Sequence, residues 1–333
     1  MKKALILLSL IFLVYLSGCI NQEKKGTTTG VIIKTFKPDI SEIFSGDSVV
    51  FTLTIENVGE EDASNVQAKL FGLGTDWTWD SSKQTIGSLM KSDSQADISG
   101  GTGDATWDAT SPSGLKVDNS YTAGVRVYYS YKTTASGTIW VYNQNYLKAN
   151  PTEAEEIMGS SGIASFSVTK APVNISLSGV ARPLIYRSGT QSSSLSILID
   201  NEGQGYPYRE TETDMEITVT KFKVANTDCL TTISDTTPRL PRSGQKSISC
   251  TFNLPSEVVE YTTIPVEVEL SYNYYLDGST TVKVLKSFTP EESTTTTTNP
   301  STTTSTTSSR CPTGQKWCAS LSRCIDESAI CPA

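Results

Sequence analysis

The stretch Val49-Val50-Phe51-Thr52-Leu53-Thr54-Ile55-Glu56 decides the fold class of this 333-residue chain. From Phe51 to Glu56, large apolar residues alternate with polar ones, which is the period-two pattern of a strand with one face on a core. The same pattern returns at Tyr121–Tyr131, Leu195–Ile199 and Ile264–Leu270. Turn residues separate these segments, and helical periodicity is nearly absent. The sequence therefore predicts an all-β fold of antiparallel sandwiches.

An internal repeat divides the chain. Ile55-Glu56-Asn57-Val58-Gly59 returns as Ile199-Asp200-Asn201-Glu202-Gly203. Later residues also match: Ser130-Tyr131 with Ser271-Tyr272, Gly137 with Gly278, and Val141 with Val282. A repeat of about 140 residues is domain-sized, because solenoid units have only roughly 20–50. We therefore predict two tandem Ig-like β-sandwiches, 31–170 and 171–289, joined at Lys170-Ala171-Pro172.

Two local elements stand out within this β pattern. A helix is predicted over Thr152–Met158, because Thr152 and Glu155 have the spacing of a capping box and Gly159 follows. A hairpin is predicted near Asp277-Gly278, with a type I turn and a glycine bulge that keeps the flanking apolar residues on one face.

The candidate binding face follows from that hairpin register. Transferred to the first copy, the register places four aromatic residues together on the outer face: Tyr128, Trp140, Tyr142 and Tyr146. Such a stripe could stack on sugar rings or on a partner protein. The alternative is that the predicted helix or the other sandwich covers it.

The N-terminus has the layout of an export signal. Lys2 and Lys3 precede an apolar run, and Leu16-Ser17-Gly18-Cys19 follows it. This resembles the lipoprotein signal of prokaryotes, which implies that residues 1–18 are removed and that Cys19 is lipidated. The alternative is an uncleaved anchor over Ala4–Ile20, which as a helix of roughly 25 Å is slightly short for a hydrocarbon core of about 30 Å. Both place the remaining chain outside, beginning with a tether at 19–30.

The composition argues against several classes of function. The net charge is −8 and no basic patch is evident, so nucleic acid is not an expected partner. The chain has no histidine, which removes the commonest general base and metal ligand. We expect no enzymatic activity, no cofactor and no metal site. The remaining enzymatic alternative is a hydrolase that uses carboxylates.

Six aspartates in a Ser/Gly-rich region could in principle offer oxygen ligands to calcium, although their spacing matches no calcium-binding loop. They are Asp76, Asp80, Asp93, Asp97, Asp104 and Asp108. A solvated loop is the favoured interpretation.

The seven cysteines have different expected fates. Cys19 would carry the lipid. Cys229 and Cys250 are predicted to form a disulfide within the second sandwich, because Cys250 alternates with Ile248 and Phe252 on an inward face and exported chains oxidise their thiols.

The last segments are not predicted to form an ordinary core. Residues 290–309 are mostly Ser and Thr, which is typical of a mucin-like stalk. Residues 310–333 contain the last four cysteines, predicted to form a small disulfide knot of open pairing: Cys311, Cys318, Cys324 and Cys331. This module resembles the first half of an LDL-receptor class A repeat. The acidic second half is missing, so calcium binding is not implied.

A further resemblance comes from three consecutive features: Ser45-Gly46-Asp47 before the strand, the alternating strand itself, and Asn57-x-Gly59 after it. Together they resemble the CARDB-type, cell-adhesion-related Ig-like domains of archaeal and bacterial surface proteins. The resemblance implies an extracellular interaction or spacer module without catalysis, and it carries over no site residues. By itself, Asn57-x-Gly59 indicates that the strand leaves through a tight turn with positive φ at the glycine.

We therefore expect a membrane-anchored extracellular lipoprotein that acts as a non-catalytic binding or adhesion module. Its expected partners are the membrane, through the lipid, and a surface protein or glycan. The alternative is a passive S-layer or envelope structural protein. Asn174, in the sequon Asn174-Ile175-Ser176, is the candidate glycosylation site.

Overall fold

The computed structural model describes residues 29–93, 95–189, 191–241, 244–287, 315–318, 323–326 and 328. The chain up to Ser287 forms one compact unit, and the chain from Phe288 forms a second. The predicted signal at 1–18, the lipidation site Cys19 and the Ser/Thr-rich segment 290–309 lie outside the described residues. The prediction of an all-β fold with mainly antiparallel sheets is confirmed.

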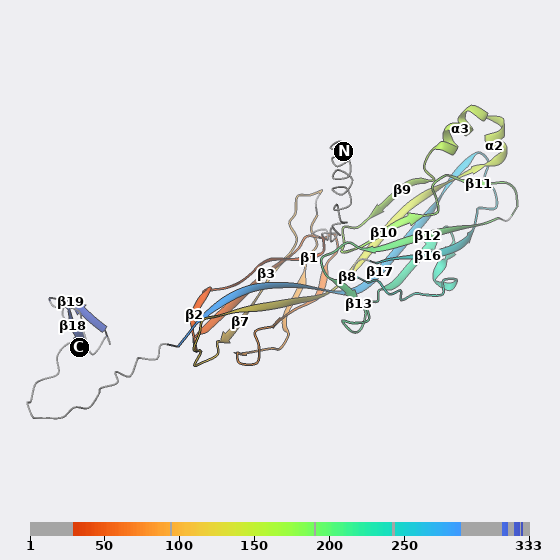
Figure 1. The fold of residues 1–333 in the computed structure, drawn as a ribbon. Coiled ribbons are helices and arrows are strands. Elements are labelled where there is room, and N and C mark those ends of the chain that lie inside the picture. Colours follow the sequence, from red (N-terminus) through yellow and green to blue (C-terminus); the bar gives the residue numbers. More distant parts are fainter. Residues whose placement is uncertain are drawn as a thin grey trace, which may run out of the picture. The chain divides into compact units, whose positions relative to one another are not determined.

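Two strands of 25 residues each, β8 (Asn119–Asn143) and β17 (Tyr261–Leu285), organise the first unit, as Figure 1 shows. They pair antiparallel along almost their whole length. Around them lies a ten-stranded sheet with the order β15-β14-β17-β8-β4-β6, to which four further strands attach. The other members are β2 (Glu42–Phe44), β4 (Ala63–Phe71), β6 (Gln84–Leu89), β9 (Ile163–Val168), β11 (Leu184–Tyr186), β13 (Tyr206–Tyr208), β14 (Thr218–Val224) and β15 (Thr227–Asp228).

Two smaller sheets complete the sandwiches. One has the order β1-β3-β7-β5 and the other β10-β12-β16. The inward residues of β3 and β12 are those that the alternation predicts, and they share one core with Val125 and Val266 of the long strands. The strands are β1 (Val31–Pro38), β3 (Ser48–Asn57), β5 (Thr78–Trp79), β7 (Thr102–Thr110), β10 (Val173–Ser178), β12 (Ser192–Asn201) and β16 (Gln245–Asn253).

The sequence repeat appears in the ten-stranded sheet as an approximate two-fold relation. Tyr131 of β8 pairs with Tyr272 of β17, the residue at the matching position of the other copy. The neighbours correspond as well, since β4 and β6 follow β8 on one side while β14 and β15 follow β17 on the other. The two copies therefore meet in the middle of one sheet.

Each sandwich contains part of the long strand of the other copy. The end of β17 pairs with β2, which belongs to the first copy, and buries Val282 and Val284 there. The end of β8 pairs with β9 and β11 and buries Ile139 and Val141. Lys170-Ala171-Pro172 thus joins two halves that share a sheet.

The predicted hairpin at Asp277-Gly278 is wrong, because β17 passes through both residues without a turn. Asp277 pairs with Arg126 and Gly278 with Val125. A Cβ atom at Gly278 would lie 2.8 Å from Cδ1 of Ile33. The glycine is therefore explained by the close approach of β1 and not by a turn.

The predicted helix is present as α3 (Pro151–Gly159), although it begins one residue earlier and Asn150, not Thr152, is its N-cap. A further helix, α2 (Gln144–Ala149), was not predicted. The side chain of Asn143 accepts a hydrogen bond from the Asn145 amide and caps α2. Within the described part of the chain, the helices are too short or too polar to span a membrane.

The predicted disulfide between Cys229 and Cys250 is confirmed. Cys229 begins a short 3₁₀ helix, η1 (Cys229–Thr231), and Cys250 lies in β16; both are fully buried, with Cα atoms 5.5 Å apart. The bridge closes a sequence separation of 21 residues, which stabilises the fold by about 3 kcal/mol in the chain-entropy model.

In the second unit, β18 (Gln315–Cys318) and β19 (Arg323–Asp326) pair antiparallel. The predicted bridges of this unit lie outside the described side chains: those of Cys311, Cys318, Cys324 and Cys331.

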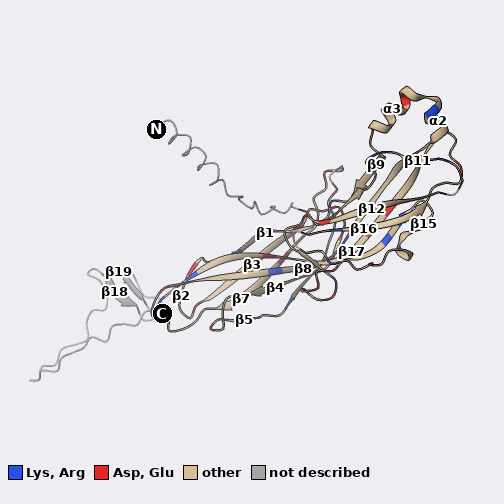
Figure 2. Cartoon of the chain, turned by 45° about the vertical axis from the view of Figure 1, so that its right-hand side comes forward, with Lys and Arg blue, Asp and Glu red and all other residues tan. Residues whose placement is uncertain are grey.

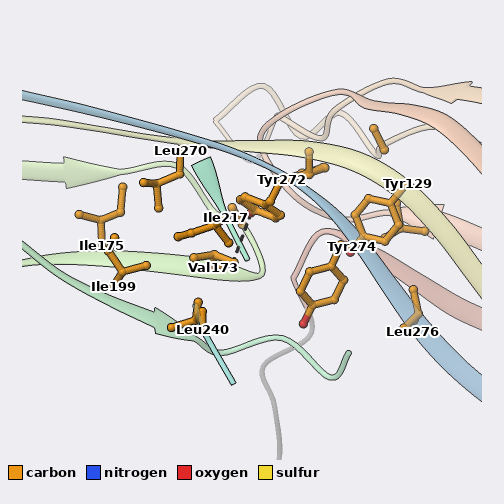
Figure 3. Close-up of a cluster of buried hydrophobic side chains, with 14 of the residues drawn as sticks. Tyr129, Val173, Ile175, Ile199, Ile217, Leu240, Leu270, Tyr272, Tyr274 and Leu276 are labelled. Carbon is orange, nitrogen blue, oxygen red and sulfur yellow. Dashed lines mark hydrogen bonds between the residues drawn. The ribbon is translucent and has the colours of Figure 1, made fainter. Parts of the chain in front are cut away.

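Tyrosines fill the core where the two sandwiches meet, and Figure 3 shows Tyr129, Tyr272 and Tyr274 there beside the apolar residues of the second half. Tyr131 completes the group, and neighbouring rings lie 5.6–6.4 Å apart between centroids. Burial raises the pKa of Tyr131 above its usual range. Burial also raises the pKa of Tyr129 and of Tyr272, so these three hydroxyls stay protonated at neutral pH.

The Asn-x-Gly motif serves this tyrosine core. Asn57 is fully buried, and its Oδ1 atom accepts a hydrogen bond of 3.2 Å from the Tyr131 hydroxyl. The predicted positive φ at Gly59 is wrong. A Cβ atom there would instead lie 2.1 Å from the Tyr131 oxygen, and one at Gly203 would lie 2.2 Å from the Tyr274 oxygen. Both glycines are required because a tyrosine hydroxyl approaches the backbone.

Candidate binding face

The four aromatic residues predicted to share one face do not form one group. Tyr128, Trp140 and Tyr142 alternate on the outer side of β8, whereas Tyr146 lies in α2. Tyr128 and Trp140 are separated by about 40 Å along the strand, at roughly 3.3 Å per residue. The structure places them in two separate clusters.

We name the first the Trp140 cluster, formed by Trp140, Tyr142 and Tyr261. Tyr142 and Tyr261 are direct cross-strand partners, and their rings are 5.4 Å apart between centroids. Trp140 lies 5.9 Å from Tyr142 and 5.8 Å from Tyr261. Tyr261 is 53% exposed, and Trp140 and Tyr142 are partly exposed. Three aromatic rings in mutual contact therefore face solvent at one end of the β8–β17 pair.

Carboxylates lie beside these rings. The hydroxyl of Tyr146 donates to both oxygens of Glu153 in α3, at 2.9 Å each. This hydrogen bond is the main reason that the pKa of Tyr146 rises to about 12, with smaller contributions from Glu260 and Tyr261. Burial, followed by the charges of Tyr261 and Glu153, raises the pKa of Tyr142. Figure 2 shows the acidic colour on α3. The Trp140 cluster thus offers stacking surface, and the neighbouring Glu153 offers hydrogen-bond acceptors.

Sequence reasoning missed Tyr261. It lies just before the alternating stretch Ile264–Leu270, so its position on the outer face could be counted along the strand. Only the pairing of β17 with β8 brings Tyr261 opposite Tyr142, and the predicted hairpin did not include that pairing.

We name the second the Arg126 cluster, formed by Arg126, Tyr128, Glu212, Tyr275 and Asp277. The guanidinium of Arg126 donates two hydrogen bonds of 2.7 Å to Asp277 and a third to Glu212. The Tyr128 hydroxyl donates to Glu212 at 2.8 Å. The guanidinium also lies 4.2 Å from the centroid of the Tyr275 ring.

The Arg126 cluster satisfies its own charges. Although burial alone would raise the pKa of Glu212, the hydrogen bonds from Tyr128 and Arg126 lower it, so the carboxylate stays ionised. Tyr128 is only 5% exposed, and Lys83 covers its ring at 3.7 Å from the centroid. The cluster ties β8, β17 and the Arg209–Glu216 loop together. Tyr128 is accordingly not available as part of a binding face.

The remaining predicted site residues lie apart from both clusters. Asn174 lies in β10, and its amide donates to Glu202 at 3.2 Å. Four of the six aspartates accept hydrogen bonds within the fold: Asp76 from Thr75, Asp80 from Ser82, Asp93 from the Gln95 amide, and Asp104 from Thr54. Among the described residues, no group of three or more acidic or cysteine side chains is placed to hold a metal ion.

The solved structures described below are distant from this chain in sequence. No family model and no curated protein matches the chain. The chain is similar over 76% of its length to the secreted serine protease VesC from Vibrio cholerae, with 11% identity and a TM-score of 0.20, and it spans about half (51%) of that chain.

Two adhesins are also similar. The collagen adhesin of S. aureus has 6% identity and a TM-score of 0.12, with 76% of this chain and 92% of that chain covered. The CupB6 tip adhesin of Pseudomonas aeruginosa has 9% identity and a TM-score of 0.13, with 79% and 97% covered. At these TM-scores none of the three bears on the function of this chain.

Proposed function

We propose that this protein is a lipid-anchored extracellular module that binds a surface glycan without catalysis, through the Trp140 cluster. The single observation that supports the proposal is the contact of three partly exposed aromatic rings on one outer face. Exposed aromatic rings that touch each other offer flat apolar surface to a sugar ring, and Glu153 offers acceptors for its hydroxyl groups. A protein partner is the second outcome that the same surface allows.

The first test replaces Trp140 by alanine. We expect Trp140→Ala to weaken binding to envelope glycans by at least about tenfold, because stacking surface at the centre of the cluster is lost. Binding is measured on immobilised oligosaccharides prepared from the native envelope, and thermal stability is measured in parallel. Phe71→Ala, at a partly exposed aromatic residue outside the cluster, is the matched control and should retain binding.

Two results contradict the proposal. Unchanged glycan binding by Trp140→Ala would show that the cluster is not the binding surface. A large fall in melting temperature would show that Trp140 is mainly packing. If the unaltered chain bound no glycan, and Trp140→Ala lost binding to an envelope protein instead, the face would be assigned to protein recognition.

A separate test addresses the anchor, which the stretch Leu16-Ser17-Gly18-Cys19 supports through its resemblance to a lipoprotein signal. We expect the unaltered protein to fractionate with membranes and to begin at a lipidated Cys19. Cys19→Ser should release it from membranes or leave the signal uncleaved. Mass spectrometry of the N-terminal peptide decides the matter, since an intact Met1 on membrane-bound native protein would exclude cleavage.

A further inference from the structure

An open strand position lies on β17, on the side that faces away from β8. On this side β13 pairs with residues 273–275 and β2 pairs with residues 283–285. Among the described strands, none pairs with this side of β17 between Leu276 and Val282. The stretch is therefore an edge between two occupied positions.

The backbone of this edge is available for pairing. The amide of Lys283 donates to the Ser41 carbonyl on the same side. Because backbone groups of alternate residues point to the same side of a strand, those of Asp277, Ser279 and Thr281 also point away from β8. All three residues are exposed. They present a row of amides and carbonyls that suits an incoming strand.

The other half of the sheet shows what fits this position. Gly137 of β8 matches Gly278 of β17 in the repeat, and β9 fills the position beside it, with Gly137 opposite Phe166. β9 precedes β10 in the chain, and β10 corresponds to β1 because Val173 pairs with Asn201 as Val31 pairs with Asn57. The strand that corresponds to β9 would therefore precede β1.

The chain's own corresponding segment has the wrong composition for this position. β9 carries Ile163, Phe166 and Val168, whereas the matching stretch Asn21–Gly26 reads Asn-Gln-Glu-Lys-Lys-Gly and has no large apolar residue. Its side chains cannot supply an apolar face to a sandwich.

The walls of the open position offer apolar contacts among polar ones. A groove of about 330 Å³ runs between β17 and β1, which is the edge strand of its own sheet. Polar residues line part of it, among them Lys34, Gln204 and Ser279. Its apolar lining comes from Ile33 and Phe36 of β1 and from Leu276 of β17. An inserted strand would bury its alternate side chains against these residues while pairing with β17.

We propose that this groove binds an extended strand of another polypeptide, antiparallel to β17 and with large apolar side chains at alternate positions. The strand takes the position on β17 that β9 takes on β8. This site is separate from the Trp140 cluster and does not depend on the proposed function.

The chain supplies its own probe. A labelled peptide with the sequence of residues 162–170, Gly-Ile-Ala-Ser-Phe-Ser-Val-Thr-Lys, is titrated into the full-length protein, and anisotropy and amide hydrogen exchange are followed. We expect saturable binding and at least about tenfold slower exchange at Asp277, Ser279 and Thr281. A peptide with aspartate in place of the phenylalanine should not bind.

Backbone N-methylation of the peptide distinguishes strand pairing from nonspecific hydrophobic binding. Methylation at one set of alternate residues should weaken binding by at least about tenfold, and methylation at the other set by much less, because only one edge of the peptide pairs with β17. Absence of binding, or equal loss with both sets, overturns the proposal. So does slow exchange of the three amides in the free protein, whether the protection comes from the chain itself or from a second copy.

Discussion

Expressed separately, residues 29–170 and 171–287 should each remain largely unfolded, and mixing them should restore the folded unit. Each half lacks part of its sandwich, since Val282 and Val284 are missing from the first and Ile139 and Val141 from the second. Burial of such side chains contributes about 1.5–3 kcal/mol each. Losing several of them removes a large share of a typical folding free energy of about 5–15 kcal/mol.

Circular dichroism and size-exclusion chromatography of the separate and mixed halves measure this outcome. The control is an intact chain with a protease site inserted after Lys170, which should stay folded and associated after cleavage. Cooperative unfolding of either half as an isolated monomer would contradict the expectation. In that case the pairing of β8 with β17 would be a contact between two independent domains.

Replacing Asn57 by alanine should destabilise the first unit by about 3–5 kcal/mol, because several buried polar groups lose their partner together. The Asn57 amide donates to the carbonyls of Glu61, Leu89 and Met90, and its oxygen accepts from Tyr131. Chemical denaturation followed by circular dichroism measures the loss as a lower transition midpoint.

Two variants calibrate this result. Tyr131→Phe removes one of these hydrogen bonds and should cost clearly less than Asn57→Ala. Thr54→Ala removes an exposed hydrogen bond to Asp104 and should stay within about 0.5 kcal/mol of the unaltered protein. If Asn57→Ala lowered the free energy of unfolding no more than Thr54→Ala does, the Asn57-x-Gly59 motif would only connect strands and would not stabilise the tyrosine core.

Local alternation predicted the core faces correctly, since a period of two is a property of each strand alone. Phe51, Leu53 and Ile55 are fully buried, as are Leu195 and Ile197. The pairing of the strands is not local. Asp277-Gly278 has the composition of a turn, but its glycine is required by the contact with Ile33, which is distant in the sequence. The sharing of strands between the halves depends on such contacts and could not be predicted from local pattern.

The candidate site shows the same limit. Trp140 and Tyr142 lie on the outer face as alternation predicts, and they touch. Tyr128 has the same alternation, yet its environment depends on Glu212, Lys83 and Tyr275, which come from other elements. Sequence periodicity gives the direction of a side chain and not what covers it.

The pairing of β8 with β17 also determines the order in which the chain can fold. Asn119 pairs with Val284, so the first copy cannot complete its sheet until nearly the whole unit has left the ribosome. Contacts between residues so far apart in sequence make folding slow, and they leave strand edges exposed in the meantime. We therefore expect the unit to fold as a whole after its last strand is made, and not half by half during synthesis.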